Sequence, residues 1–215
     1  MALFGYLATF FTFAALVLQV FSMIGTTYNR PFLRDLYFAK VTIRNDFYIF
    51  GLWSYCTGDI RSRDSSSFVV ESCSKPVPAF DWTNTEGINR YFRDIGDLHK
   101  LFLADFILYW IALGFTLLAL IITIMSHFRR GPDLLASLMT FIAFIIQMVV
   151  FIIMLVVGIR GVNAVKSYDP DIANGQLGPS MWMTLGAFVA LLISSIAYCF
   201  ACIFGRGRTH SGEKA

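Results

Sequence analysis

Cysteines carry the most reactive side chains in this sequence, and they form two pairs with different spacing. Sixteen residues separate Cys56 from Cys73 in a polar segment, and two separate Cys199 from Cys202 near the end of an apolar run. A pair on the oxidising side of a membrane is expected to form a disulfide. A cysteine at the cytosolic edge of a span stays reduced and can be S-acylated. A zinc site at the first pair is disfavoured, because the only histidine of that segment, His99, lies at its far end.

Other reactive groups are sparse. His99, His127 and His210 are far apart in the sequence. We find no nucleophile elbow, Gly-rich phosphate loop or histidine cluster. We therefore expect a protein that is not an enzyme and that has no cofactor and no metal. Within the apolar runs, Asp105 is expected near an interface, and Gln147 is expected in a hydrogen bond between helices rather than in an ion pathway.

Four long apolar runs define the class of protein. Hydrophobic residues make up 57% of the 215 residues and charged residues only 14%, against about 25% charged in soluble domains. Asp, Glu, Lys, Arg and His are absent from residues 1–29, 106–126, 134–159 and 172–205. A bilayer-spanning helix needs about 20 apolar residues. The sequence therefore predicts four spans, the first being a retained helix rather than a cleaved signal peptide.

The predicted fold class is an all-α transmembrane four-helix bundle with a small disulfide-linked extracellular domain that contains β-strands. The expected segments are helices over 1–25, 101–126, 134–160 and 180–205, a loop domain over 26–100, a turn over 127–133, a second loop over 161–179 and a tail over 206–215.

Basic residues indicate the orientation. Five flank the proposed cytosolic side: Arg129, Arg130, Arg206, Arg208 and Lys214. The second loop has two, Arg160 and Lys166, beside acidic residues. Since short cytosolic loops are enriched in Lys and Arg, both termini are expected in the cytosol. The five cations can also bind anionic lipid, although topology marking alone would explain them.

This orientation places Cys56 and Cys73 on the oxidising side, where we expect a disulfide, with two free thiols in a small core as the alternative. It places Cys199 and Cys202 at the cytosolic edge, where S-acylation competes with simple apolar packing.

Local patterns predict two strands and one packing face. Aromatic and branched residues over 47–56 and the segment 67–73 suit strands. Trp53 is expected on one strand face, anchoring the loop domain to the membrane-facing core. Gly186, Ala190 and Ser194 recur every four residues, which suits close helix packing within the bundle or a lateral face between copies.

Gly51-Leu52-Trp53 followed by Cys56 and Cys73 resembles the signature of the claudin-like superfamily, without an upstream tryptophan and with a wider cysteine spacing. The chain is more similar to the fungal four-span family of cortical-patch, eisosome-associated proteins and PalI pH-response proteins. The segments that carry this second resemblance are 29–38, the Gly-Leu-Trp and cysteine segment, Tyr168-Asp169-Pro170 and 177–182.

The resemblance implies a plasma-membrane protein that organises a membrane microdomain by lateral assembly. Two alternatives are an accessory subunit of an ambient-pH sensing complex and a claudin-like pore or ion-entry regulator. The expected partners are membrane lipids, anionic or ordered, and further copies or other four-span proteins, with no nucleic acid. The short tail favours the first function.

Overall fold

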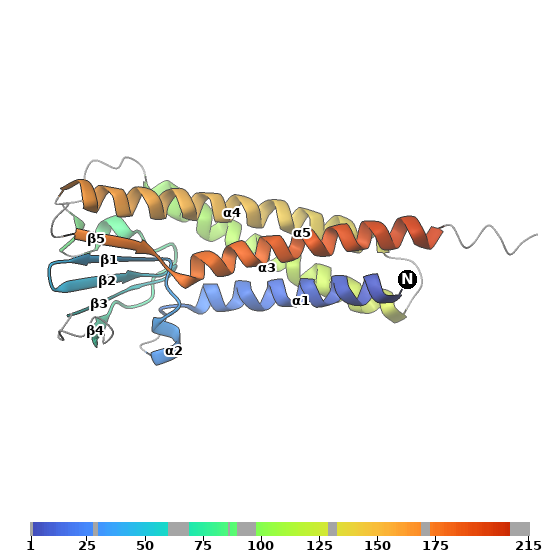
Figure 1. Ribbon diagram of the computed structural model, residues 1–215, viewed down its shortest axis with the longest axis horizontal. Helices are drawn as coiled ribbons and strands as arrows, with labels where there is room; N and C mark the ends of the chain where they lie inside the picture. The colour runs from blue at the N-terminus through green and yellow to red at the C-terminus, as the bar shows by residue number, and fades with distance from the viewer. Residues whose placement is uncertain are drawn as a thin grey trace, which may run out of the picture. The chain divides into compact units, whose positions relative to one another are not determined.

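A computed structural model describes residues 2–27, 30–59, 69–85, 87–89, 98–128, 133–168 and 173–206 (Figure 1). Four long helices dominate it: α1 (Ala2–Ile24), α3 (Leu98–Phe128), α4 (Asp133–Tyr168) and α5 (Pro179–Arg206). The shorter elements are α2 (Pro31–Arg34), η1 (Trp82–Asn84), β1 (Ala39–Ile43), β2 (Asp46–Phe50), β3 (Tyr55–Asp59), β4 (Val69–Cys73) and β5 (Ala173–Leu177).

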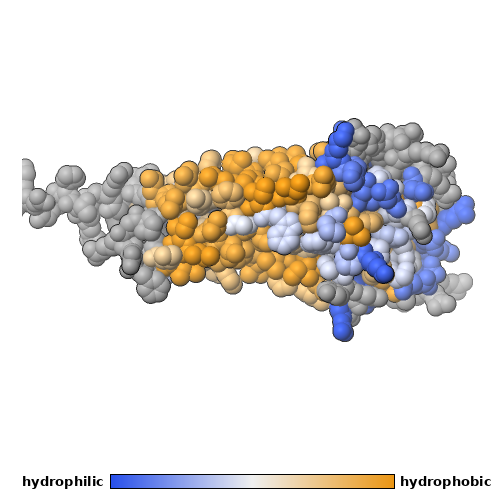
Figure 2. Space-filling view, turned by 180° about the vertical axis from the view of Figure 1, so that it is seen from behind, coloured by the Kyte–Doolittle hydropathy of each residue, from blue (hydrophilic) through white to orange (hydrophobic). Residues whose placement is uncertain are grey.

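Length and hydropathy allow all four long helices to cross a bilayer. The apolar stretches are Gly5–Ile24, His99–Met125, Leu134–Ser167 and Pro179–Ala201. A helix satisfies its backbone hydrogen bonds internally, which a bilayer interior demands. Large apolar side chains cover the described surface of these helices (Figure 2). The chain is therefore a multi-pass membrane protein with four spans, as the sequence predicted.

The chain divides into two compact units. The helical unit comprises residues 1–20, 109–149 and 184–215, and the sheet unit comprises 21–108 and 150–183. Each long helix contributes residues to both units.

Small residues at seven-residue spacing build the interior of the helical unit. One layer contains Ala8, Ala136 and Ala197, and the next contains Ala15, Ala143 and Ala190. Seven-residue spacing keeps one face of each helix directed at its neighbours. Small side chains on that face let the helix backbones approach closely, which is how helices associate in a bilayer.

Polar side chains of the helical unit are paired in its interior. The Gln19 Nε2 donates to Gln147 Oε1 at 2.9 Å, so the expected hydrogen bond of Gln147 between helices is confirmed. The Thr12 and Ser194 hydroxyls lie 2.6 Å apart, and Tyr198 donates to Thr123 at 2.7 Å. In an apolar medium such pairs are worth about 0.6–2 kcal/mol each.

Five antiparallel strands form one sheet in the order β4-β3-β2-β1-β5. The predicted single strand over 47–56 is wrong, because residues 51–54 form the turn of the β2–β3 hairpin, closed by a bond from Gly51 N–H to the Ser54 carbonyl at 2.9 Å. Trp53 therefore lies in a turn and not on a strand face. β5 comes from the second predicted loop and pairs with β1 from Ala39↔Leu177 to Ile43↔Ala173.

The glutamine pair provides a test of the helical unit. Replacing Gln147 with Leu should cost about 1 kcal/mol of unfolding free energy, because the buried Gln19 amide loses its acceptor. Gln19→Leu with Gln147→Leu should recover most of that loss. The measurement is a double-mutant cycle of unfolding in detergent micelles. Asn174→Leu, at an exposed position of β5, is the control and should change little. Additive losses in the double variant would contradict the pairing.

Candidate functional site

The β2–β3 turn is the centre of the site. Its four residues, Gly51, Leu52, Trp53 and Ser54, are called the hairpin plug below. Leu52 and Ser54 are buried and Trp53 is half-buried. The plug contacts the ends of two helices, α1 and α3, within the sheet unit.

The Trp53 indole joins the plug to both helices. Its Nε1–H donates to the Met23 carbonyl at 2.8 Å. Met23 lies in the last turn of α1, where helix carbonyls lack partners within the helix. The Trp53 ring also packs edge-on against Phe106 of α3, with 4.9 Å between centroids. One side chain thus satisfies a carbonyl of α1 and packs on α3, so it fixes the hairpin on the helix ends.

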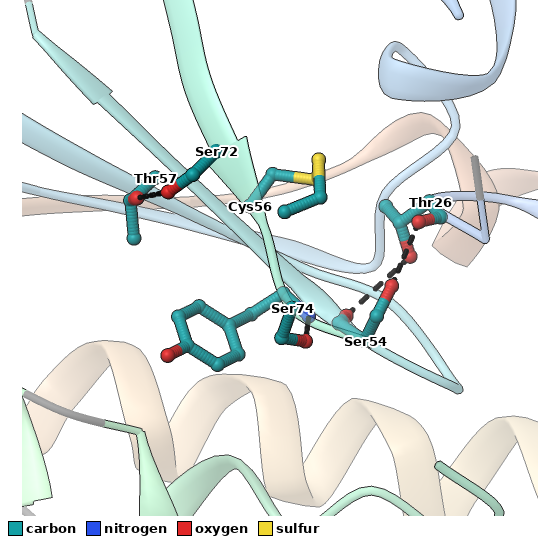
Figure 3. The surroundings of a disulfide bond; sticks show 8 residues. Thr26, Ser54, Cys56, Thr57, Ser72 and Ser74 are labelled. Carbon is teal, nitrogen blue, oxygen red and sulfur yellow. Dashed lines mark hydrogen bonds between the residues drawn. A yellow bond between two sulfur atoms is a disulfide. The ribbon is translucent and has the colours of Figure 1, made fainter. Parts of the chain in front are cut away.

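A second contact of the plug is with Thr26, directly after α1. The Ser54 hydroxyl donates to the Thr26 carbonyl at 2.7 Å (Figure 3). A Cβ at Gly51 would overlap the Thr26 hydroxyl, so only glycine fits there. Thr26 has a φ of 63°, which is strained for a β-branched residue. A strained backbone of this kind persists only where the surrounding contacts hold it, so the contacts with Gly51 and Ser54 fix the conformation of Thr26.

Trp82 provides a second indole on the same turn. Its Nε1–H donates to the Gly51 carbonyl at 3.0 Å. Its ring stacks on the Phe50 ring, with 5.1 Å between centroids, and contacts the Phe102 ring of α3, with 5.2 Å between centroids. The Asp81 carboxylate accepts from Thr83 N–H and holds η1 in place. These contacts could not be predicted from the sequence, since a tryptophan in a turn does not reveal its distant partner.

The disulfide closes the sheet next to the plug. Cys56 of β3 and Cys73 of β4 are bonded and stand directly opposite each other in the register (Figure 3). The predicted disulfide is therefore confirmed. Beside it the Thr57 and Ser72 hydroxyls lie 3.0 Å apart, and Ser74 accepts from Tyr55 N–H at 3.1 Å. A bridge that closes a loop of this size stabilises a fold by about 3 kcal/mol in the chain-entropy model.

Two sequence segments that carried the family resemblance meet at the start of α5. Gly178 N–H donates to the Phe38 carbonyl at 2.8 Å, and Ser180 N–H donates to the Tyr37 carbonyl at 3.1 Å. A Cβ at Gly178 would overlap the Tyr37 carbonyl oxygen. This contact joins the segment before β1 to the first turn of α5. Of the third segment, Asp169 and Pro170 lie outside the described residues, and Tyr168 ends α4.

Residues 4–202 match the sequence profile of the SUR7/PalI family. The chain belongs to the SUR7/PalI family. The match covers all four spans and the sheet. The hairpin plug and the disulfide therefore lie within the residues that match the SUR7/PalI family. A search of curated proteins finds no match.

The predicted packing face of α5 contacts α1 of the same chain. Ala190 lies in the layer with Ala15, and Ser194 is bonded to Thr12. A Cβ at Gly186 would lie 3.3 Å from Leu18 Cδ1. These three positions therefore serve packing within the helical unit.

The predicted acylation and lipid-binding residues are described only in part. Cys199 is an exposed free thiol whose Sγ lies 3.2 Å from the Ser137 hydroxyl. It borders an apolar groove of about 440 Å³ between α4 and α5, lined by Leu134, Ser137, Leu138, Phe141 and Ser195. The side chains of Cys202 and Arg206 lie outside the described residues, as do Arg129, Arg130, Arg208 and Lys214. Acylation and lipid binding at these residues stay predictions.

Two acidic features differ from an ordinary solvated surface. Asp105 in α3 is 1% exposed, and neither carboxylate oxygen has a hydrogen-bond partner in the described part of the chain. It is thus buried in the protein rather than solvated at a helix start.

Asp46 stands opposite Asp59 in the β2–β3 register. A hydrogen bond with Asp59, burial and repulsion by its charge raise the pKa of Asp46. Among the described residues, no group of three His, Cys, Asp or Glu is arranged to hold a metal ion.

Trp53 gives a graded test of the hairpin plug. Trp53→Phe should lower the unfolding free energy by about 1 kcal/mol, because it keeps a ring against Phe106 and loses one hydrogen bond. Trp53→Ala should cost about 3 kcal/mol or more, because the ring is removed as well. Thermal and denaturant unfolding in detergent measures both.

Trp182→Ala is the control, because this exposed tryptophan of α5 is expected to change unfolding by much less. Equal losses for the alanine variants of Trp53 and Trp182 would contradict an anchoring role for Trp53.

Proposed function

We propose that this SUR7/PalI protein is a non-catalytic organiser of a plasma-membrane microdomain and works by lateral assembly in the bilayer. The observation that carries the proposal is the hairpin plug. The partners of Trp53 and Ser54 given above lie within the chain, on the ends of α1 and α3. Residues used in this way hold a domain in place and do not perform chemistry on a substrate.

A platform fixed to helix ends suits an assembly role. The sheet is held by the plug, by the disulfide and by the contact of Gly178 with Phe38. Contacts between copies, or with other four-span proteins, cost less conformational entropy when the surfaces are pre-organised. A rigid sheet next to the membrane would provide such a surface.

Lateral assembly also needs a surface of the spans that can contact lipid or a neighbouring chain. Leu134, Leu138 and Phe141 of α4 are exposed along the apolar groove beside Cys199. In the proposal this face contacts ordered lipid or a neighbouring four-span chain, and acylation of Cys199 would strengthen its preference for ordered lipid.

The proposed location is the plasma membrane with both termini in the cytosol. The basic residues of the turn and the tail support it through the positive-inside rule. The disulfide supports it as well, since such bonds persist on the oxidising side of a membrane.

The experiment compares two glycine variants in living fungal cells. The tagged chain should form stable cortical patches with slow fluorescence recovery after bleaching. Gly51→Ala should reduce patch formation, because the new methyl group overlaps Thr26. Gly114→Ala is the matched control, since a Cβ there has no described heavy atom within 4 Å. A wild-type chain that diffuses freely and forms no patches would overturn the proposal.

One observation favours a second candidate, an accessory subunit of an ambient-pH sensing complex. Lys40 of β1 is only 5% exposed, and burial lowers the pKa of its amine to about 8. Its Nζ lies 5.2 Å from the centroid of the Phe47 ring. An amine that loses its proton near this pH would change the charge inside the sheet as the surroundings become alkaline.

The pH dependence of stability tests the environment of Lys40. The unfolded chain holds this proton up to its ordinary pKa of about 10.5 and the folded chain up to about 8. Between these values the unfolded state binds more protons, so stability should rise as the pH increases from about 8 toward 10. Lys40→Met should remove this rise.

The comparison is made in a Cys199→Ser, Cys202→Ser background, so that thiol chemistry does not interfere at alkaline pH. Unfolding free energies that rise equally with and without Lys40 would assign the effect to other groups.

A further inference from the structure

The short helix α2 is held close to the end of α1 by backbone contacts. Thr26 N–H donates to the Leu33 carbonyl at 3.1 Å, while the bond from Arg34 N–H to the Arg30 carbonyl at 3.0 Å closes the turn of α2 itself. A Cβ at Gly25 would overlap the Leu36 carbonyl oxygen. Pro31 at the first position presets the helical backbone. α2 therefore has a defined place beside the last turn of α1 (Figure 1).

α2 has an exposed aromatic side chain, Phe32, which lies next to the exposed apolar surface of α1. Phe32 is 62% exposed. Its ring meets the ring of Phe21 edge-on, with 5.9 Å between centroids. Phe21 belongs to the span Gly5–Ile24 and is itself 40% exposed. The exposed face of Phe32 thus continues a surface that already faces lipid.

Two arginines flank this phenylalanine. Arg30 is exposed and Arg34 is half-exposed. Neither guanidinium makes an ion pair with any residue in the described ranges. Arginine forms paired hydrogen bonds with phosphate, and its long side chain can keep the charge in water while its stem lies on an apolar surface.

We propose that α2 is a membrane-surface anchor: Phe32 inserts into the leaflet that borders the sheet unit, and Arg30 and Arg34 bind the phosphates of its lipids. An apolar ring between two cations is the pattern of an interfacial amphipathic segment. Contact with Phe21 sets the depth of Phe32, since Phe21 lies in the last turn of the span Gly5–Ile24. This proposal does not rest on the function proposed above.

The commitment to lipid rests on the continuity with α1. A protein partner on Phe32 would also have to cover Phe21 and Ile24, which lie within a span and are exposed there. The bilayer covers all three side chains at once. Arginines at the level of the headgroups then find the phosphate partners that the described part of the chain does not provide.

The test is a nitroxide spin label at position 32. The chain carries Phe32→Cys with Cys199→Ser and Cys202→Ser, and the Cys56–Cys73 disulfide is kept. The full chain is reconstituted in phosphatidylcholine vesicles with phosphatidylserine. Collisions of the label with oxygen, which concentrates in lipid, are compared with collisions with a water-soluble nickel complex. Val77→Cys is the matched control, because Val77 is 50% exposed in the sheet unit and outside the spans.

We expect oxygen collisions to dominate at position 32 and nickel collisions to dominate at position 77. A nickel-dominated signal at both positions would show that α2 stands in water and would overturn the proposal. A label at position 32 that is immobile and shielded from both reagents would indicate a contact between copies and would overturn it as well.

The arginines are tested by charge-matched variants that carry the same label. Arg30→Gln with Arg34→Gln should shift the label at position 32 toward water and so raise its nickel collisions. Arg44→Gln with Lys75→Gln removes the same charge from exposed positions elsewhere in the sheet unit and should leave the label unchanged. If both double variants shifted the label equally, the shift would come from the general attraction of the protein's charge to the membrane. That result would overturn the proposal that Arg30 and Arg34 bind lipid phosphates.

Discussion

The hydrogen bond from the Trp53 indole to the Met23 carbonyl is the interaction on which the sheet unit depends. A helix that ends at the surface of a bilayer leaves its last carbonyls without partners. Trp53 satisfies one of them and brings a large ring against Phe106 in the same step. Trp82 approaches the same turn from another direction and bonds to the Gly51 carbonyl. Two indole rings therefore hold the turn in place. The turn also fixes the position of β2 and β3, the two strands that it connects.

The helical unit is governed by a different constraint. In lipid there is no hydrophobic gain from bringing two apolar helices together, so close packing and paired polar groups must associate them. Alanines at seven-residue spacing provide the close packing, and the Gln19–Gln147 and Thr12–Ser194 pairs provide directional bonds. Many large apolar side chains, such as Leu118, Leu138 and Phe141, are exposed on the outside, where lipid can cover them. In the sheet unit, by contrast, Asp105 is a buried carboxylate whose oxygens have no hydrogen-bond partner in the described ranges.

Together these features hold the described parts of the fold in place. The residues that carry the SUR7/PalI resemblance hold segments together: Gly51 against Thr26, Gly178 against Tyr37, and Cys56 with Cys73. In the function proposed above, these contacts would provide a pre-organised sheet, and the exposed apolar side chains of the spans would provide lateral faces. The anchor proposed for α2 would add a third contact with the membrane and limit how far the start of the sheet can move from the lipid surface. Microdomain assembly and pH sensing would use this same scaffold through different surfaces.

The four spans and the disulfide could be predicted from the sequence alone. The length of the charge-free runs determines which segments can cross a bilayer, and two cysteines on an oxidising side have few other stable states. The hairpin at residues 51–54 could not be predicted, because aromatic and aliphatic residues continue through it and its contact with Thr26 joins residues far apart in the chain. β5 was also beyond reach, since Ala173–Leu177 contains glycine and asparagine and becomes a strand only by pairing with β1. The partners of Trp53 and Trp82 are about 20 to 50 residues away in the chain. Such contacts depend on how helix ends and strands meet in space, which only the tertiary structure decided.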